Sequence, residues 1–173
     1  NFNGDDFDGV LTPLLNEVTQ ILNTPNNILG IEYCKALLRL NSQIRLEQYS
    51  SNLYLQMSAW CDHQRYTGSA TFLREHAAEE LQHMYKLFDY VCETGALAVL
   101  GALDAPPPNY KSLAEVFEVT YGHELGITAA INQLVASALA EQDFSTFQFL
   151  QWYVSEQHEE ERLFKSILDK IAV

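Results

Sequence analysis

The chain has 173 residues, with 23 Asp and Glu against 10 Lys and Arg, so its formal net charge is −13. This length suits one domain, and 47% hydrophobic residues are too many for a disordered acidic chain. The negative charge disfavours nucleic acid as a partner, and the longest apolar stretch, residues 96–103, is far shorter than the roughly 20 residues that span a membrane.

Residues 1–33 are predicted to form an N-terminal extension that carries one short amphipathic helix. Thr12 and Pro13 give a start signal, a capping residue followed by proline at the first helical position. Apolar residues then recur at helical spacing as far as Leu22. The main domain is expected to cover residues 34–173.

Four longer stretches repeat apolar residues at helical spacing, while strand patterns are nearly absent. The predicted helices cover about residues 34–62, 67–94, 112–139 and 144–171. The first two and the last two are separated by only a few residues, so each pair should form an antiparallel hairpin. Helices of this length are roughly 42 Å long, and an extended 95–111 link can reach roughly 56 Å. The link can therefore run the whole bundle and make the second and third helices parallel.

Capping residues support these boundaries. Gly95 follows the second stretch, as expected for a residue that ends a helix. Ser112 and Ser145 are predicted N-terminal caps of the third and fourth helices. Glu115 lies three residues after Ser112, which predicts a capping box.

One glutamate lies in the apolar stripe of each predicted helix, near its midpoint: Glu47, Glu80, Glu124 and Glu160. In a four-helix bundle these four carboxylates would meet at one level of the core. Burying them together would cost several kcal/mol each and leave like charges side by side, so a cation is expected among them. His83 follows Glu80 by three residues, and Glu-x-x-His is the di-metal pattern of helix bundles. Oxygen-rich ligands with one imidazole suit iron or manganese.

The same residues also allow simpler interpretations. A single glutamate on an apolar stripe is more often a boundary residue or a protonated acid, and Glu-x-x-His spacing alone is common. Four glutamates at one level together with His83 favour a di-metal centre. Glu79, Glu156 and Glu159 form either an outer, hydrated cation site that shares Glu160 or a solvated charged face.

Several further residues have ordinary interpretations beside functional ones. Tyr54 and Trp152 are either plain core residues or electron donors close to the metals. Four histidines lack a partner pattern and are assigned as surface or ordinary core residues: His63, His76, His123 and His158.

Three segments, residues 46–54, 74–84 and 149–161, closely resemble bacterial non-haem ferritins, and the similarity runs without gaps from about residue 40 to residue 170. The resemblance implies an all-α, ferritin-like four-helix bundle with one long crossover. It also implies a 24-subunit shell that oxidises Fe(II) with O₂ or peroxide and stores the ferric mineral. The family usually adds a fifth helix after these four, and no such helix is obvious before Val173.

Site residues follow from the resemblance by position. Glu47, Glu80 and His83 would hold the first iron, and Glu80, Glu124 and Glu160 the second, with Gln157 beside it. A third iron site would comprise Glu79, Glu156, Glu159 and Glu160. Tyr54 and Trp152 would be the aromatic residues near the centre. Bacterioferritins repeat Glu-x-x-His where this chain has Gln157 and Glu160. Haem-binding members carry Met where this chain has Leu81, so no haem is expected.

Two alternative functions differ from iron storage. A di-iron peroxidase of the rubrerythrin kind would need an electron-delivery partner or a Cys₄ iron domain. The chain has three cysteines and no CxxC pair, which disfavours that alternative. A structural shell subunit with a silent site is disfavoured by the intact ligand set. The cysteines are expected to be reduced, and no signal peptide is visible, as in a cytoplasmic protein.

Overall fold

The computed structural model describes residues 28–171 of the chain, and their side chains from residue 38 onward. These residues form four helices: α2 (Ile28–His63), α3 (Thr67–Glu93), α4 (Leu113–Ala140) and α5 (Phe144–Ile171). Strands are absent from this part of the chain, and none of its helices is long and apolar enough to cross a membrane. The helix predicted over residues 13–22 lies outside the described residues.

Three of the four helices begin and end within one residue of their predicted bounds. The exception is α2, which begins at Ile28 and not at residue 34. Gly30 lies in its first turn, where glycine costs roughly 1 kcal/mol relative to alanine without ending the helix. The chain separates into two units within α2, residues 1–36 and residues 37–173. The expected division at residue 33 stays a prediction.

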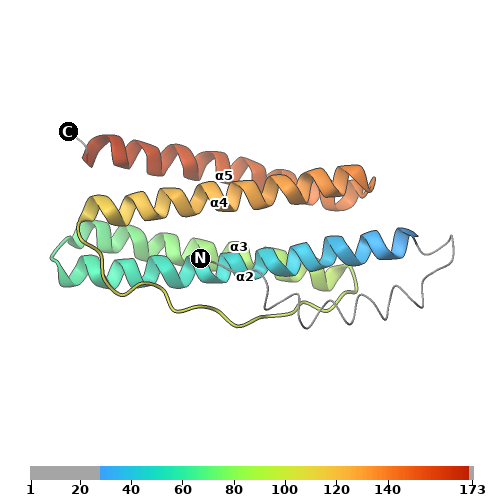
Figure 1. The fold of residues 1–173 in the computed structure, drawn as a ribbon, viewed down its shortest axis with the longest axis horizontal. Helices are drawn as coiled ribbons and strands as arrows, with labels where there is room; N and C mark the ends of the chain where they lie inside the picture. The colour runs from blue at the N-terminus through green and yellow to red at the C-terminus, as the bar shows by residue number, and fades with distance from the viewer. Residues whose placement is uncertain (1–27, 172–173) are drawn as a thin grey trace. The chain divides into compact units, whose positions relative to one another are not determined.

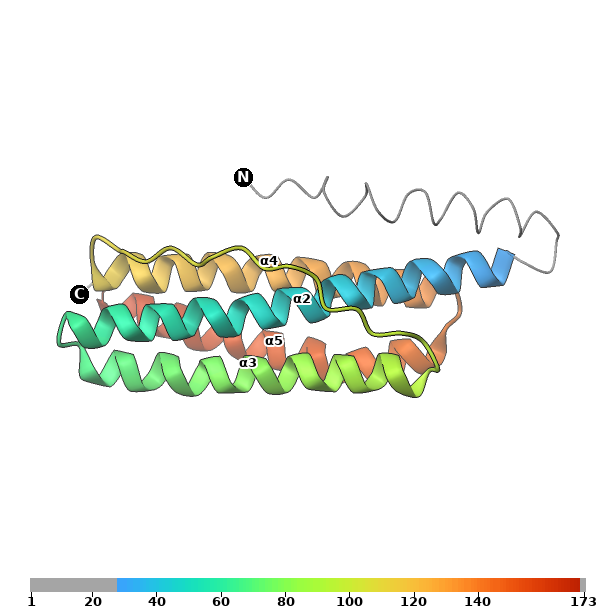
Figure 2. The same ribbon diagram turned by 90° about the horizontal axis from the view of Figure 1, so that it is seen from below.

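The second unit is a four-helix bundle built from two antiparallel hairpins, α2 with α3 and α4 with α5 (Figure 1). The link between α3 and α4 runs back along the bundle, so these two helices point the same way (Figure 2). Asn41 fastens the link to α2, because its side-chain oxygen accepts a hydrogen bond of 2.8 Å from the backbone N–H of Val99. The predicted all-α bundle with one long crossover is therefore confirmed.

The apolar core of the bundle consists of two clusters, and every helix contributes to both. One cluster comprises Leu40, Ile44, Met84, Leu87, Val91, Ile127, Ile131, Leu134, Ala138, Leu150 and Tyr153. The other comprises Leu53, Tyr54, Met57, Trp60, Cys61, Ala70, Leu73, Ala77, Val116, Phe117 and Phe164. On each helix, a stretch near the midpoint separates the residues of one cluster from those of the other. The buried residues in that stretch are polar, and they include the four glutamates Glu47, Glu80, Glu124 and Glu160.

Helix ends follow the predicted capping chemistry in part. The Ser112 side chain accepts a hydrogen bond from the Glu115 N–H, which confirms this residue as the N-terminal cap of α4. The Ser145 prediction is wrong. Asp143 caps α5 instead, because one of its carboxylate oxygens accepts a 3.0 Å hydrogen bond from the Thr146 N–H. Aspartate and serine cap equally well, but Asp143 directly precedes the first helical residue, Phe144, whereas Ser145 lies inside the helix.

Helices α2, α3 and α4 end in the same way, with one residue of positive φ that turns the chain. Gly95 has φ 79°, and the following N–H of Ala96 bonds back to the Val91 carbonyl at 3.3 Å. Arg65 and Gln142 take the same place after α2 and α4, with φ of 68° and 57°. The left-handed conformation costs a non-glycine residue roughly 1–2 kcal/mol, so two of these three turns carry strain.

Candidate metal centre

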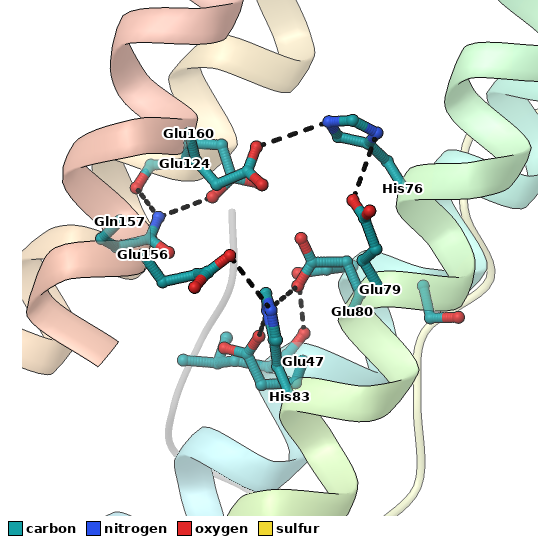
Figure 3. A network of polar contacts seen from close by, with 12 residues as sticks. Glu47, His76, Glu79, Glu80, His83, Glu124, Glu156, Gln157 and Glu160 are labelled. Atoms are coloured by element: carbon teal, nitrogen blue, oxygen red, sulfur yellow. Dashed lines mark hydrogen bonds and ion pairs between the residues drawn. The ribbon is translucent and has the colours of Figure 1, made fainter. Parts of the chain in front are cut away.

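Figure 3 shows four buried glutamates, one from each helix, directed toward one another. Along each helix they lie between the residues of the two apolar clusters. The exposed fraction is 0% for Glu47, 3% for Glu80, 1% for Glu124 and 7% for Glu160. Each belongs to the apolar stripe of its helix, and this position turns it inward. Carboxylates are almost never buried to this degree without a partner, which marks this layer as a site and not as packing.

Glu47, Glu80 and His83 form the first cluster of possible metal ligands. One ligand atom from each lies within 4.8 Å of the others. His83 Nδ1 is 3.5 Å from Glu80 Oε2 and 3.8 Å from Glu47 Oε2. The Gln43 amide donates a 2.6 Å hydrogen bond to Glu47 Oε1, which orients that carboxylate and leaves its buried Oε2 without a hydrogen bond.

Without a cation, burial disfavours the ionised form of these carboxylates. Burial raises the pKa of Glu47 well above its usual range, and the neighbouring Glu80 raises it further. Burial, followed by the charge of Glu124, likewise raises the pKa of Glu80. A divalent cation would reverse this preference, because it stabilises the ionised form of each ligand.

Glu124 is held by two neighbours that the resemblance assigned to the centre, Gln157 beside the second iron and Tyr54 among the nearby aromatic residues. The Tyr54 hydroxyl donates to its Oε1, and the Gln157 amide donates to its Oε2 at 2.6 Å. Burial raises the pKa of Glu124, while these two hydrogen bonds lower it. Tyr54 and Gln157 therefore fix the orientation of this carboxylate.

Glu160 belongs to a second cluster of possible metal ligands. Burial raises its pKa to about 8, and the charges of Glu124 and Glu79 act in the same direction. Its Oε2 has no hydrogen bond and lies 3.6 Å from His76 Nε2. His76, Glu79 and Glu160 offer three ligand atoms that all lie within 4.8 Å of one another.

His76 is a functional candidate that sequence reasoning missed. Its other ring nitrogen, Nδ1, is 3.5 Å from Glu79 Oε2, so the ring lies between two carboxylates (Figure 3). The available signal was the His-x-x-Glu spacing from His76 to Glu79, which mirrors the Glu-x-x-His pair that was recognised. His123, by contrast, is an ordinary core histidine: its Nε2 lies 2.8 Å from Ser50 Oγ, and burial lowers its pKa to about 4.

The remaining predicted residues surround the second cluster. A cavity beside α3 and α5 is lined in part by Glu79, Glu156, Glu159 and Glu160. Glu156 also reaches the first cluster, since its Oε1 lies 3.9 Å from His83 Nε2. The predicted outer carboxylates are thus brought together on one side of the site.

Two aromatic rings contact His83. The Trp152 ring lies edge-on at 5.4 Å between centroids, and the Lys86 ammonium sits 3.9 Å from the Trp152 centroid on the side chain's π face. Tyr153, which sequence reasoning did not assign to the site, is fully buried at 5.8 Å from the His83 ring. Burial and the nearby Glu47 raise the pKa of its hydroxyl.

Comparisons with known proteins agree with this architecture. A family profile described as the ferritin-like domain matches residues 37–172. A Haemophilus influenzae protein named a "probable bacterial non-heme ferritin-like protein" is 64% identical over 132 residues, or 76% of this chain and 80% of its own length. The "bacterial non-heme ferritin" of Escherichia coli O6:H1 is 55% identical over 135 residues, or 78% of this chain and 82% of its own.

Solved structures give the same result. The Chlorobium tepidum ferritin is 55% identical, with a TM-score of 0.79 over 80% of this chain and 85% of its own. An open-pore ferritin from the archaeon Archaeoglobus fulgidus is 41% identical, with a TM-score of 0.79 over 80% of this chain and 84% of its own.

Proposed function

Because the chain belongs to the ferritin family, we propose that it is an iron-storage protein. It oxidises Fe(II) to Fe(III) with O₂ or peroxide at a paired-iron centre and keeps the ferric mineral inside an oligomeric shell. The observation that carries this proposal is the layer of four buried glutamates between two apolar clusters, in which one oxygen of Glu47 and one of Glu160 accept no hydrogen bond. Such a layer is costly unless cations fill it.

In the proposed centre, Glu47, Glu80 and His83 hold one iron. Glu80 bridges to the second iron, which Glu124 and Glu160 also bind. The first-iron assignment is supported by the ligand atoms of Glu47, Glu80 and His83, which lie within 4.8 Å of one another. The second set is supported by the burial of its carboxylates. The outer carboxylates Glu79, Glu156 and Glu159, with Glu160, are proposed to hold a third iron, supported by the cavity that they line together.

The ligand set favours oxidation of the bound iron. Carboxylates stabilise Fe(III) more than Fe(II), so an oxygen-rich site lowers the reduction potential of the bound iron. Two Fe(II) ions give two electrons to O₂, which takes up two protons to form H₂O₂; with peroxide as oxidant the product is water. Iron binding itself releases the protons that the raised pKa values hold on Glu80 and Glu160.

Tyr54 and Trp152 are proposed to supply further electrons to the oxidant. Tyr54 donates its hydroxyl hydrogen bond to the second-site ligand Glu124, and Trp152 contacts the first-site ligand His83. Gln157 has a positioning role through Glu124.

The test is rapid mixing of iron-free protein with Fe(II) and O₂, with Fe(III) formation followed by absorbance. The double variant Glu80→Ala with His83→Ala should lose fast oxidation, because it removes the bridging ligand and the only imidazole of the pair. Glu118→Ala, an exposed glutamate of α4, is the matched control and should oxidise iron at the wild-type rate. Fast oxidation by the double variant would refute the assignment.

The shell and the cellular location are also proposals. Kinship with ferritins supports self-association, which we propose gives a 24-subunit cage. The free thiols of Cys61 and Cys92 support a reducing, cytoplasmic location. Native mass combined with iron content separates the alternatives. A storage cage would be loaded far beyond its binding sites. A peroxidase of the rubrerythrin kind would hold about two irons for each bundle, and a structural subunit with a silent site would hold none.

A further inference from the structure

We propose that the Lys86 ammonium opposes removal of an electron from the Trp152 indole, so that Trp152 is a reserve donor behind Tyr54. Lys86 acts through another side chain and is therefore a positioning residue. The inference rests on the electron-donor role proposed above for Trp152, and it adds the residue that regulates this role.

The contact that carries this proposal joins α3 and α5. Lys86 is exposed on α3, Trp152 is half-buried on α5, and the ammonium lies 3.9 Å from the centroid of the indole ring. A cation within about 6 Å of an indole centroid is attracted to the face of the ring. The same indole contacts the rings of His83 and Tyr153, at centroid distances of 5.4 and 4.6 Å. These contacts hold the Trp152 ring beside a positive charge.

The indole N–H of Trp152 has no proton acceptor. Its Nε1 is buried and has no hydrogen-bond partner among the described residues. When one electron passes from the ring to the O₂-derived oxidant, the N–H bond therefore stays intact, and the oxidised ring carries one unit of positive charge. That charge forms 3.9 Å from the Lys86 ammonium.

The size of the effect follows from the charges. Before the electron leaves, the ammonium is attracted to the ring face, and afterwards it is repelled by the oxidised ring. Two unit charges about 4 Å apart repel each other appreciably even at the dielectric constant of water. Removing the cation should favour oxidation of the ring at least about fivefold, which corresponds to about 1 kcal/mol at 1.36 kcal/mol per factor of ten.

Glu156 is the charged group that could offset Lys86. It follows Trp152 by one turn of α5, and its carboxylate would favour a positive ring. Its Oε1 lies 3.9 Å from His83 Nε2, and Glu156 belongs to the outer iron site proposed above, where bound iron would cancel its charge. The Lys86 ammonium keeps its charge when the iron sites are filled, so its effect persists during oxidation.

Tyr54 differs from Trp152 because it has a proton acceptor. Its hydroxyl donates a hydrogen bond to Glu124. The proton can therefore pass to that carboxylate as the electron leaves, and the product is a neutral radical. Tyr153 cannot take over the charge of Trp152 in this way, because its hydroxyl has no hydrogen-bond partner in the described part of the chain. Tyr54 should therefore donate before Trp152.

The first experiment contains no iron, so its result does not depend on the paired-iron assignment. Chelator-treated protein is oxidised by photogenerated ruthenium(III) tris-bipyridine, and the absorbance of the tryptophan radical gives the rate. Trp60→Phe leaves Trp152 as the only tryptophan of the chain. If that background does not fold, subtracting the signal of Trp152→Phe from that of wild type isolates the same ring. Lys86→Met should be oxidised about two- to fivefold faster than Lys86 protein.

Two controls separate charge from packing. Lys86→Arg keeps the cation and should restore the rate of the Lys86 protein, whereas Lys165→Met removes another exposed lysine, on α5, and should leave the rate unchanged. Measurement in about 1 M salt, where the Debye length is about 3 Å, screens attraction of the cationic oxidant to the protein surface. If Lys86 only packed on the ring, Lys86→Met would keep an unbranched side chain there and the rate would not change. An unchanged rate in Lys86→Met, or an equal acceleration by Lys165→Met, would overturn the proposal.

The second experiment adds Fe(II) and O₂ and identifies the radicals by electron paramagnetic resonance after rapid freezing. In wild type the signal should belong mainly to tyrosine. Lys86→Met should add a tryptophan signal, which should disappear in the double variant with Trp152→Phe. If ruthenium oxidises Lys86→Met faster but no variant forms a tryptophan radical with iron, the donor role proposed for Trp152 fails and the effect of Lys86 on the ring stands.

Discussion

Raising the pH from 6.5 to 8 should destabilise the cation-free chain, with Glu160 as a main cause. Burial raises the pKa of this carboxyl from its ordinary value of 4.5 to about 8. Between these two values the unfolded chain has lost the proton that the folded chain still holds. The free energy of unfolding therefore falls as pH rises through this window.

The lower limit of pH 6.5 isolates the carboxylates from the histidines. Burial lowers the pKa of His76, and that of His123 to about 4, so both resist protonation in the folded chain and favour stability as pH rises toward their ordinary value of 6.5. Above 6.5 this opposing effect has ended. From there to about 8 Glu160 alone should lower the free energy of unfolding by about 2 kcal/mol, at about 1.36 kcal/mol per pH unit.

The assay is urea denaturation of chelator-treated protein at several pH values, with and without Zn²⁺. Between pH 6.5 and 8 the free energy of unfolding of Glu160→Gln should fall by about 2 kcal/mol less than that of wild type, because the amide does not titrate. Zn²⁺ should reverse the trend in wild type, since ions bind the deprotonated carboxylates more tightly as pH rises. Equal pH dependence in wild type and Glu160→Gln, or a cation-free chain that gains stability from pH 6.5 to 8, would refute the reasoning.

Three further substitutions test the fold. Arg65→Gly should stabilise the chain by about 1 kcal/mol, seen as a higher urea midpoint, because glycine tolerates the φ of 68° after α2. Asp143→Ala should cost about 1 kcal/mol and lower the melting temperature, through loss of the cap bond to the Thr146 N–H. Leu87→Ala should cost about 2–5 kcal/mol by opening a cavity in the core. The control Leu97→Ala, at an 81% exposed site, should leave the melting temperature nearly unchanged, and similar effects of the two leucine variants would contradict the core placement.

The helices were predictable where local chemistry decides them. Ser112 and Gly95 lie at the boundaries that capping rules give, and the apolar stripes end with them. Ser145 was misassigned because Asp143, an equally good capping residue, directly precedes the first helical residue Phe144, whereas Ser145 lies inside α5. The start of α2 was predicted six residues too late, although Asn27, a residue type favoured as an N-terminal cap, directly precedes Ile28 in the sequence.

The buried carboxylates were predictable because each lies on the apolar stripe of its helix near the midpoint, and His83 because it lies at a recognised spacing from Glu80. Glu80 and His83 are neighbours on α3, so their convergence follows from helix geometry. The contact between His76 and Glu160 joins two different helices, which bring the two side chains within 3.6 Å, and no local pattern in the sequence predicts it. Tyr153 escaped notice because an aromatic residue on an apolar stripe looks the same whether it faces other apolar residues or a carboxylate.

The crossover link gives the proposed centre a mechanical role. The first hairpin supplies Glu47, Glu80 and His83, the second supplies Glu124 and Glu160, and one extended link joins the two. Ions shared between Glu80 and Glu124 would therefore act as a reversible cross-link between two halves of the chain that meet only when the bundle is assembled. Like a disulfide, such a bond closes a long loop; unlike one, it tightens or loosens with the supply of cation. Iron would thus be both the stored substrate and a bound ion that stabilises the assembled bundle.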